Sequence, residues 1–211
     1  ESGKETLTET AWNLCNLEDT LDLLLDRDIY KKQLTLKKNM ELQHPKVYCD
    51  VLKIQEITMN LLSNAVKYTP EGGTIHFTIR ELPYEREGYA LFQTVVEDTG
   101  IGISKEYIPH LFEAFSREKS SSESGIIGTG LGLRIVKKFV DLMEGSIVVE
   151  SEIGEGTRFT VTIPHRIATA NEYISEENAK ELPEEIKQGI NKRVSDLISD
   201  MKYNFQNDSY F

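Results

Sequence analysis

The helix-like stretch "IQEITMNLLSNAVKYT" carries four polar side chains that could act on one ligand. Glu56, Asn60, Asn64 and Lys67 follow at intervals of four, four and three residues and so share one helix face. Carboxamide oxygens suit Mg²⁺, which takes few protein oxygens and completes its shell with water and phosphate. Lys67 would supply positive charge for that phosphate. The alternative is a solvated stripe, although asparagine forms helices poorly.

A second candidate is "EDTGIGIS", in which Asp98 ends an apolar run and Gly100 and Gly102 follow. An ionised aspartate can only accept hydrogen bonds, so Asp98 could accept from an exocyclic amine. The glycines would let the backbone pass close to a flat ring. The alternative is an ordinary turn after a strand.

The third candidate, "GTGLGLRI", packs glycines before an apolar stretch but matches neither the dinucleotide fingerprint nor the P-loop. At a helix N-terminus such glycines favour an anion site, to which basic neighbours could add charge. The alternatives are a flexible hinge or cap and basic residues that are merely on the surface. The residues concerned are Gly128, Gly130 and Gly132, with Arg117, Lys119 and Arg134.

Just before these glycines, "FEAF" places Phe112 and Phe115 ahead of a run of small polar residues, Ser116–Ile127. Most such aromatic side chains belong to cores. Here they could anchor one end of a lid over a bound ligand.

Regular elements with clear periods surround these candidates. Asp50 can cap a helix that runs to about Tyr68, and "TPEGG" stops it. Period-2 alternation predicts a strand over "TIHFTIR". Further strands are predicted over "YALFQTVVED", "SIVVES" and "TRFTVTIP", with a glycine turn between the last two. Another helix is predicted by Leu131, Ile135, Phe139 and Met143, with Gly145 as its stop. The fold class is therefore α+β, an antiparallel-leaning sheet with helices on one face.

Composition restricts the class of protein further. The chain has 211 residues, 39% of them hydrophobic, which suggests one sizeable domain and an appendage. A net charge of −11 argues against a nucleic-acid partner. We expect a cytoplasmic fragment of a longer chain with two reduced thiols, attached to a membrane, if at all, only through N-terminal parts absent here. Beyond residue 168 an acidic tail carries a helical apolar stripe, Ile186, Ile190, Val194, Leu197 and Met201.

Taken in order, "NLLSNAVKYT", "DTGIGIS", "FEAF" and "GTGLGL" resemble the four ATP-site boxes of sensor histidine kinases. The chain is similar, over about Glu1–Pro164, to their ATP-binding catalytic domain. That resemblance implies a Bergerat-type α/β sandwich, with a mixed, largely antiparallel sheet, helices on one face and an ATP lid. It implies three parts: 1–20, the end of a dimerisation helix and linker; 21–167, the catalytic domain; and 168–211, an acidic extension.

The resemblance also implies ATP and Mg²⁺ as ligands and assigns residues to them. Asn60 and Asn64 would hold Mg²⁺, Lys67 would act on the phosphates, and Glu56 is a weak candidate base. Asp98 would bind the adenine amine and Thr157, in "GEGTRF", would approach the adenine. The remaining nucleotide contacts would be Tyr68, Gly100, Gly102, Phe115, Arg117, Lys119, Gly128, Thr129, Gly130, Leu131 and Gly132.

One residue, Asn60, distinguishes this chain from the Bergerat enzymes that hydrolyse ATP. Bergerat enzymes that hydrolyse ATP place a glutamate where this chain has Asn60, which cannot act as a base. The resemblance therefore implies transfer of the γ-phosphoryl group to a histidine on a separate dimerisation domain, with a response-regulator receiver domain downstream. "FSREKSSSESGIIGTGLGL" is most similar to lids of hybrid kinases. The alternative function is a degenerate module that senses nucleotide without kinase activity.

Overall fold

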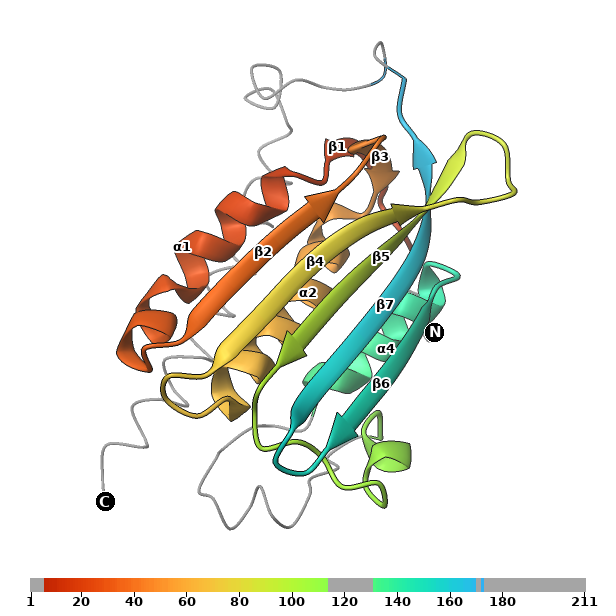
Figure 1. The fold of residues 1–211 in the computed structure, drawn as a ribbon. Helices are drawn as coiled ribbons and strands as arrows, with labels where there is room; N and C mark the ends of the chain where they lie inside the picture. Colours follow the sequence, from red (N-terminus) through yellow and green to blue (C-terminus); the bar gives the residue numbers. More distant parts are fainter. Residues whose placement is uncertain (1–5, 114–130, 170–171, 173–211) are drawn as a thin grey trace.

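The computed structural model describes residues 6–113, 131–169 and 172, and shows one seven-stranded sheet (Figure 1). The strands follow the order β1-β3-β7-β5-β4-β2, and β6 pairs with β7 beside this path. Strands β2 and β4 are parallel, and every other pair is antiparallel. Their bounds are β1 (Thr10–Asn13), β2 (Thr35–Glu41), β3 (Lys46–Cys49), β4 (Thr74–Leu82), β5 (Tyr89–Asp98), β6 (Ser146–Glu152) and β7 (Gly156–Ile167).

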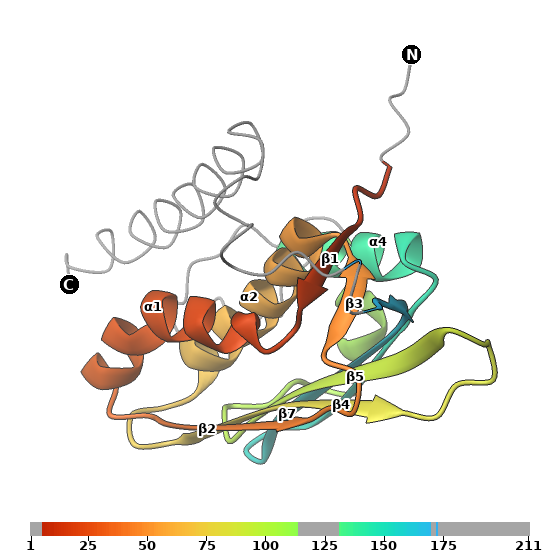
Figure 2. The same cartoon turned by 90° about the horizontal axis from the view of Figure 1, so that it is seen from above.

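The helices of the described residues cover one face of this sheet (Figures 1 and 2). They are α1 (Asn16–Lys31), α2 (Val51–Tyr68) and α4 (Gly132–Leu142), and a short 3₁₀ turn, η1 (Ile108–His110), follows β5. The expected α+β architecture, a largely antiparallel sheet with helices on one side, is confirmed.

The core forms where the helices meet the inner face of the sheet. Ile75, Phe77 and Ile79 alternate along β4 and are all buried, as the period-2 pattern predicts. Helix α2 contributes an apolar face that includes Leu61 and Leu62, both fully buried. This central packing fixes α2 along the sheet and therefore positions the polar stripe that α2 carries.

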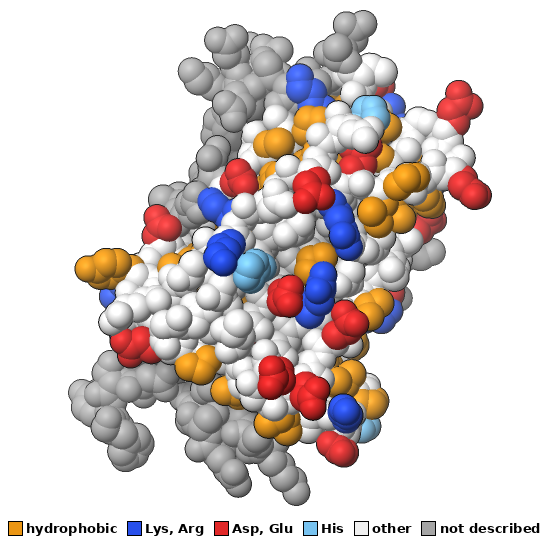
Figure 3. Space-filling view, viewed as in Figure 1, with side chains coloured by type: hydrophobic (Ala, Val, Ile, Leu, Met, Phe, Trp, Pro, Cys, Tyr) orange, Lys and Arg blue, Asp and Glu red, His pale blue; other side chains and the backbone are white. Residues whose placement is uncertain are grey.

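The outer face of the sheet has no helix over it in the described residues, and it is polar with charges of both signs (Figure 3). Arg158 on β7 lies between Glu97 on β5, at 3.5 Å, and Glu150 on β6, at 4.0 Å. These pairs are half exposed and contribute little stability, because water screens them. The face therefore keeps the sheet soluble on one side while the helices close the other.

Three strands were not recognised in the sequence. β1 pairs with β3, and β2 forms the edge of the sheet against β4. Leu14 and Leu17, which follow β1, are buried in the core. Strands as short as β1 and β3 leave little periodic signal, and their partners are distant in sequence. The expected helix in the acidic tail lies outside the described residues.

No helix among the described residues is long and apolar enough to cross a membrane. A small cavity of about 20 Å³ lies between the first turns of α2 and the sheet. Its lining includes Ile54, Phe92 and His165, and its volume is about that of one water molecule. It is too small for a ligand.

Candidate functional site

Helix α2 begins and ends as its capping residues require. Asp50 at the N-cap accepts from the backbone amide of Lys53 at 3.2 Å and from the ammonium of Lys53 at 2.8 Å. The predicted helix Asp50 to Tyr68 is thus confirmed, since α2 spans Val51–Tyr68. The apolar side of this helix packs against the core. The predicted stripe lies beside it at the edge of the core and is half-buried; it consists of Glu56, Asn60, Asn64 and Lys67.

Lys32, which the sequence did not single out, secures the far end of α2. Its ammonium donates to the carbonyls of Val66, at 2.7 Å, and Lys67, at 3.1 Å. A cation at a helix C-terminus satisfies carbonyls that have no partner inside the helix. Burial lowers the pKa of Lys32, and Asp28 opposes this effect. The contact holds Lys67 and Tyr68, both expected to bind nucleotide, in a defined place.

Asn60 faces the N-terminus of α4. Its amide nitrogen donates to the carbonyl of Glu56 at 2.8 Å, so the side-chain oxygen points the other way. A Cβ built on Gly132, the first residue of α4, would lie only 2.5 Å from that oxygen. A side chain at Gly132 would therefore displace the Asn60 carboxamide, and its absence lets the carboxamide oxygen and the helix N-terminus share one small space.

Asp98 closes the other end of the site. It is the last residue of β5, is 7% exposed, and accepts from the backbone amide of Gly100 at 2.8 Å. Burial raises the pKa of its carboxyl to about 6 and Glu97 adds to the rise, whereas the backbone amides of Gly100 and Thr157 lower it. A buried carboxylate with two amide donors still has acceptor capacity for a ligand.

Thr157, the second residue of β7, lies directly opposite Asp98 in the sheet register, and it too is buried. Its hydroxyl lies 2.9 Å from the hydroxyl of Ser151 on β6. Ser151 also donates to the carbonyl of Gly156, at 2.7 Å, and accepts from the backbone amide of Ile103, at 2.8 Å. Sequence reasoning did not single out Ser151, because its amide donor Ile103 comes from a segment 48 residues away.

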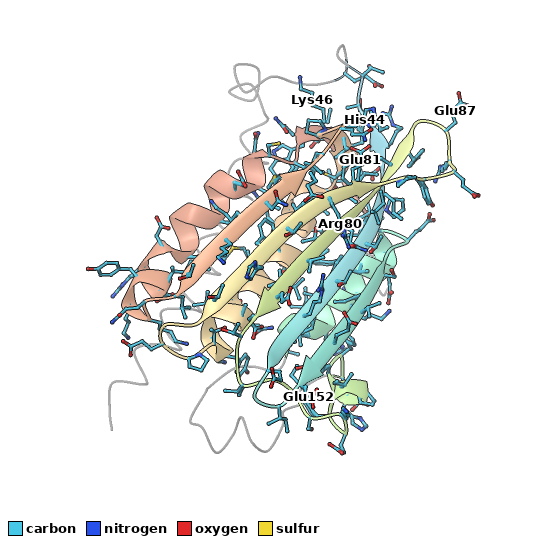
Figure 4. The ribbon with its side chains drawn as sticks, in the orientation of Figure 1. His44, Lys46, Arg80, Glu81, Glu87 and Glu152 are labelled. Carbon is cyan, nitrogen blue, oxygen red and sulfur yellow. The ribbon has the colours of Figure 1, made fainter. Side chains whose placement is uncertain are left out.

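The glycine-rich loop after β5 is held against the β6–β7 turn. Gly102 has a φ of +71°, and a Cβ there would lie 1.9 Å from the carbonyl of Glu152, so only glycine fits. The backbone carbonyl of Ile101 accepts from the backbone amide of Gly154 at 2.9 Å, and the backbone amide of Ile101 donates to the carbonyl of Tyr68 at 3.2 Å. Glu152 lies at the end of β6 beside this loop (Figure 4). The loop thus joins the C-terminus of α2 to the turn before Thr157.

The structure places most predicted residues along one line. Glu56, Asn60, Asn64, Lys67 and Tyr68 follow α2, and helices α2 and α4 pack together near Gly132. Asp98, Gly100, Gly102 and Thr157 lie at the ends of β5 and β7, and Leu131 is the N-cap of α4. The remaining predicted contacts, Phe115, Arg117, Lys119, Gly128, Thr129 and Gly130, and the expected lid Ser116–Ile127, lie outside the described residues.

This line of residues has two chemically different ends. One end accepts hydrogen bonds, and the other places carboxamide oxygens beside the N-terminus of a helix. Asp98 and Thr157 can face N–H donors, and the α4 N-terminus can face an anion. Within the described residues, no group of three or more His, Cys, Asp and Glu side chains could hold a metal. A metal bound at this line would therefore depend on carboxamide oxygens and on an anionic ligand.

Comparison with known proteins agrees with this arrangement. Residues 49–167 match the family described as "Histidine kinase-, DNA gyrase B-, and HSP90-like ATPase". Hybrid signal transduction histidine kinase B of Dictyostelium discoideum is 34% identical over 199 residues, which are 92% of this chain and 10% of that protein. The chain spans between 10% and 22% of the length of the curated relatives it matches.

Two solved structures share the fold. The catalytic domain of the histidine kinase ThkA superposes with a TM-score of 0.63 and 26% identity, covering 74% of this chain and 95% of that one. Full-length ShkA in complex with AMPPNP gives a TM-score of 0.64 and 25% identity, covering 80% of this chain and 33% of that one. The family match includes α2, the Asp98 loop and Thr157. The chain belongs to the family of histidine kinase-, DNA gyrase B- and HSP90-like ATPases.

Proposed function

We propose that this chain is the ATP-binding catalytic domain of a two-component sensor histidine kinase. It would transfer the γ-phosphoryl group of ATP to a histidine on a separate dimerisation domain. Support comes from the family match and from relatives that are named as sensor and hybrid histidine kinases. The chain is a small part of those relatives, so the complete reaction belongs to a larger protein.

The observation that carries this proposal is the two-ended line of polar groups. Asp98 is a buried acceptor at one end, suited to the amine of adenine, and Asn60 faces the first residue of α4 at the other. A nucleoside triphosphate is complementary to these two ends, with N–H donors on its base and anionic oxygens on its phosphates. Lys67 lies between the two ends, one turn beyond Asn64. Tyr68 follows it, and its ring lies 5.3 Å from the Lys67 ammonium.

Mg²⁺ fits the residues present. The Asn60 oxygen is turned away from its own helix by the bond from its amide nitrogen to Glu56. Asn60 and Asn64 would hold the ion together with the phosphates and water, as hard cations with few protein ligands are held. When bound, the ion would neutralise charge on the phosphates. Lys67 would hold the same phosphates as a point charge.

The side chain of Asn60 favours transfer over hydrolysis. A carboxamide cannot remove a proton from water, so this position cannot activate a water molecule for attack. Phosphoryl transfer needs mainly positioning and charge stabilisation, which the α2 stripe and the α4 N-terminus would supply. Glu56, one turn earlier on α2, stays the weak candidate for a base.

None of the four histidines resembles a phosphoacceptor of the expected kind, because none precedes Glu or Asp. His165 is 4% exposed within the core. His44 is bound to Glu81, with its Nδ1 2.7 Å from the carboxylate (Figure 4), and His110 pairs with Glu113. His76 lies on the outer face of the sheet, away from α2. The acceptor is therefore expected on another domain, and a response-regulator receiver domain would take the phosphoryl group next.

The test is transfer of label from γ-³²P-ATP. The chain is incubated alone and with the separately expressed dimerisation domain of its full-length protein, and acid-labile label is measured on each. Label should appear on the added domain, should depend on Mg²⁺, and should be absent with the Asn64→Ala variant. Ser63→Ala, the adjacent residue of α2, serves as the matched control. ATP binding without any transfer would favour the degenerate nucleotide-sensing module instead, and label on the chain itself would refute the proposed acceptor.

A further inference from the structure

Ser151 joins three segments that surround the acceptor end of the site. From the end of β6 its hydroxyl contacts the carbonyl of Gly156, the backbone amide of Ile103 and the hydroxyl of Thr157, at 2.7, 2.8 and 2.9 Å. Ile103 belongs to the glycine-rich loop after Asp98, and Gly156 immediately precedes Thr157. A serine hydroxyl has one hydrogen and two lone pairs, so these three contacts use all of its capacity.

Counting hydrogens fixes the direction of each bond. The carbonyl of Gly156 can only accept, so it takes the single hydrogen of Ser151. The amide of Ile103 can only donate, so it takes one lone pair. The contact with Thr157 must therefore use the hydrogen of Thr157, which donates to the remaining lone pair of Ser151. The hydroxyl hydrogen of Thr157 is committed, and only lone pairs of Thr157 remain for a ligand.

We propose that Ser151 sets base specificity by holding the hydroxyl of Thr157 as an acceptor. Asp98 and Thr157, which face each other in the register of β5 and β7, then form a pair of acceptors. A base edge with N–H donors, such as the amine at position six of adenine, satisfies both. A carbonyl at that position meets two acceptors and is rejected. Ser151 is a positioning residue here, since it acts through Thr157. The inference rests on the proposed function.

The difference between two nucleotides measures this effect. ADP and inosine diphosphate differ in the base at position six, an amine in the first and a carbonyl in the second. Replacing Ser151 by alanine frees the hydroxyl of Thr157 to rotate and donate to that carbonyl. Because one neutral hydrogen bond is regained, the preference for ADP over inosine diphosphate should shrink about fivefold in Ser151→Ala.

A double-mutant cycle separates this role from a merely structural one. Calorimetry at pH 8 with Mg²⁺ gives both dissociation constants for the wild type, Ser151→Ala, Thr157→Val and the double variant. Thr157→Val keeps the shape of the side chain but removes the hydroxyl, so Ser151→Ala should no longer change the preference in that background. Ser146→Ala, at the exposed start of the same strand, is the matched control.

Each outcome decides between the two roles. A reduced preference that depends on the Thr157 hydroxyl supports the inference. Equal weakening of both nucleotides, or the same change of preference with and without that hydroxyl, means that Ser151 only supports the Ile103 loop and overturns it. A wild type that binds neither nucleotide overturns the proposed function as well. If Ser151→Ala does not fold, Ser151→Cys, which bonds weakly at similar volume, replaces it in the cycle.

Discussion

The buried carboxylate of Asp98 should make the nucleotide-free protein less stable at neutral pH. Its pKa is about 6 in the folded chain, compared with an ordinary value of 3.8. Between these values the folded state binds more protons than the unfolded state, so the free energy of unfolding falls as pH rises. At about 1.4 kcal/mol for each pH unit in this window, the total loss is about 3 kcal/mol.

Asp98→Asn isolates this contribution. Urea unfolding without nucleotide, repeated from pH 3.5 to pH 7.5, gives the free energy of unfolding for the wild type and the variant at each pH. The wild-type value minus the variant value should fall by about 3 kcal/mol as pH rises from about 4 to above 6. All other titrating groups occur in both proteins and cancel in this difference.

Glu97→Gln is the matched control, because it removes a carboxylate from the adjacent residue of β5 that points to the outer face of the sheet. This variant should not reproduce the change seen for Asp98→Asn. A difference that stays constant with pH, or that grows as pH rises, would refute the reasoning. Asp98→Asn should also lose binding of ATP, because we propose Asp98 as the acceptor for the adenine amine.

Three other predictions follow from neighbouring contacts. Burial lowers the pKa of His165 to about 4 from 6.5, so the stability that it contributes is present above pH 6.5. About 3 kcal/mol should be lost as pH falls from 6.5 to 4, seen as a falling difference between the wild type and His165→Phe in urea. Lys32→Met should cost about 1–2 kcal/mol, and Lys32→Arg less, in thermal unfolding, because the C-terminal carbonyls of α2 lose a charged donor. Asn64→Ala should remove the Mg²⁺-dependent gain in ATP affinity measured by calorimetry; an unchanged gain would exclude Asn64 as a ligand.

Local patterns in the chain were sufficient for the elements that carry the chemistry. The polar stripe of α2, the alternation in β4 and the helix after Gly132 each have a period that one segment displays by itself. The order of the four ATP-site boxes then indicated the family, because each box combines a residue type with its place on an element. These predictions depend only on neighbours within about one helix turn or one strand.

Tertiary structure alone decided how the segments meet. Lys32 reaches carbonyls 34 and 35 residues away, and Ser151 binds an amide 48 residues away. The strand pairing of β1 with β3 and of β2 with β4 is likewise set by packing on the shared core. Such contacts leave no local signal, because a serine or a lysine has the same side chain wherever its partner lies. The direction of the hydrogen bond at Thr157 is therefore fixed only when the fold brings the distant loop that contains Ile103 against Ser151 in the β6–β7 hairpin.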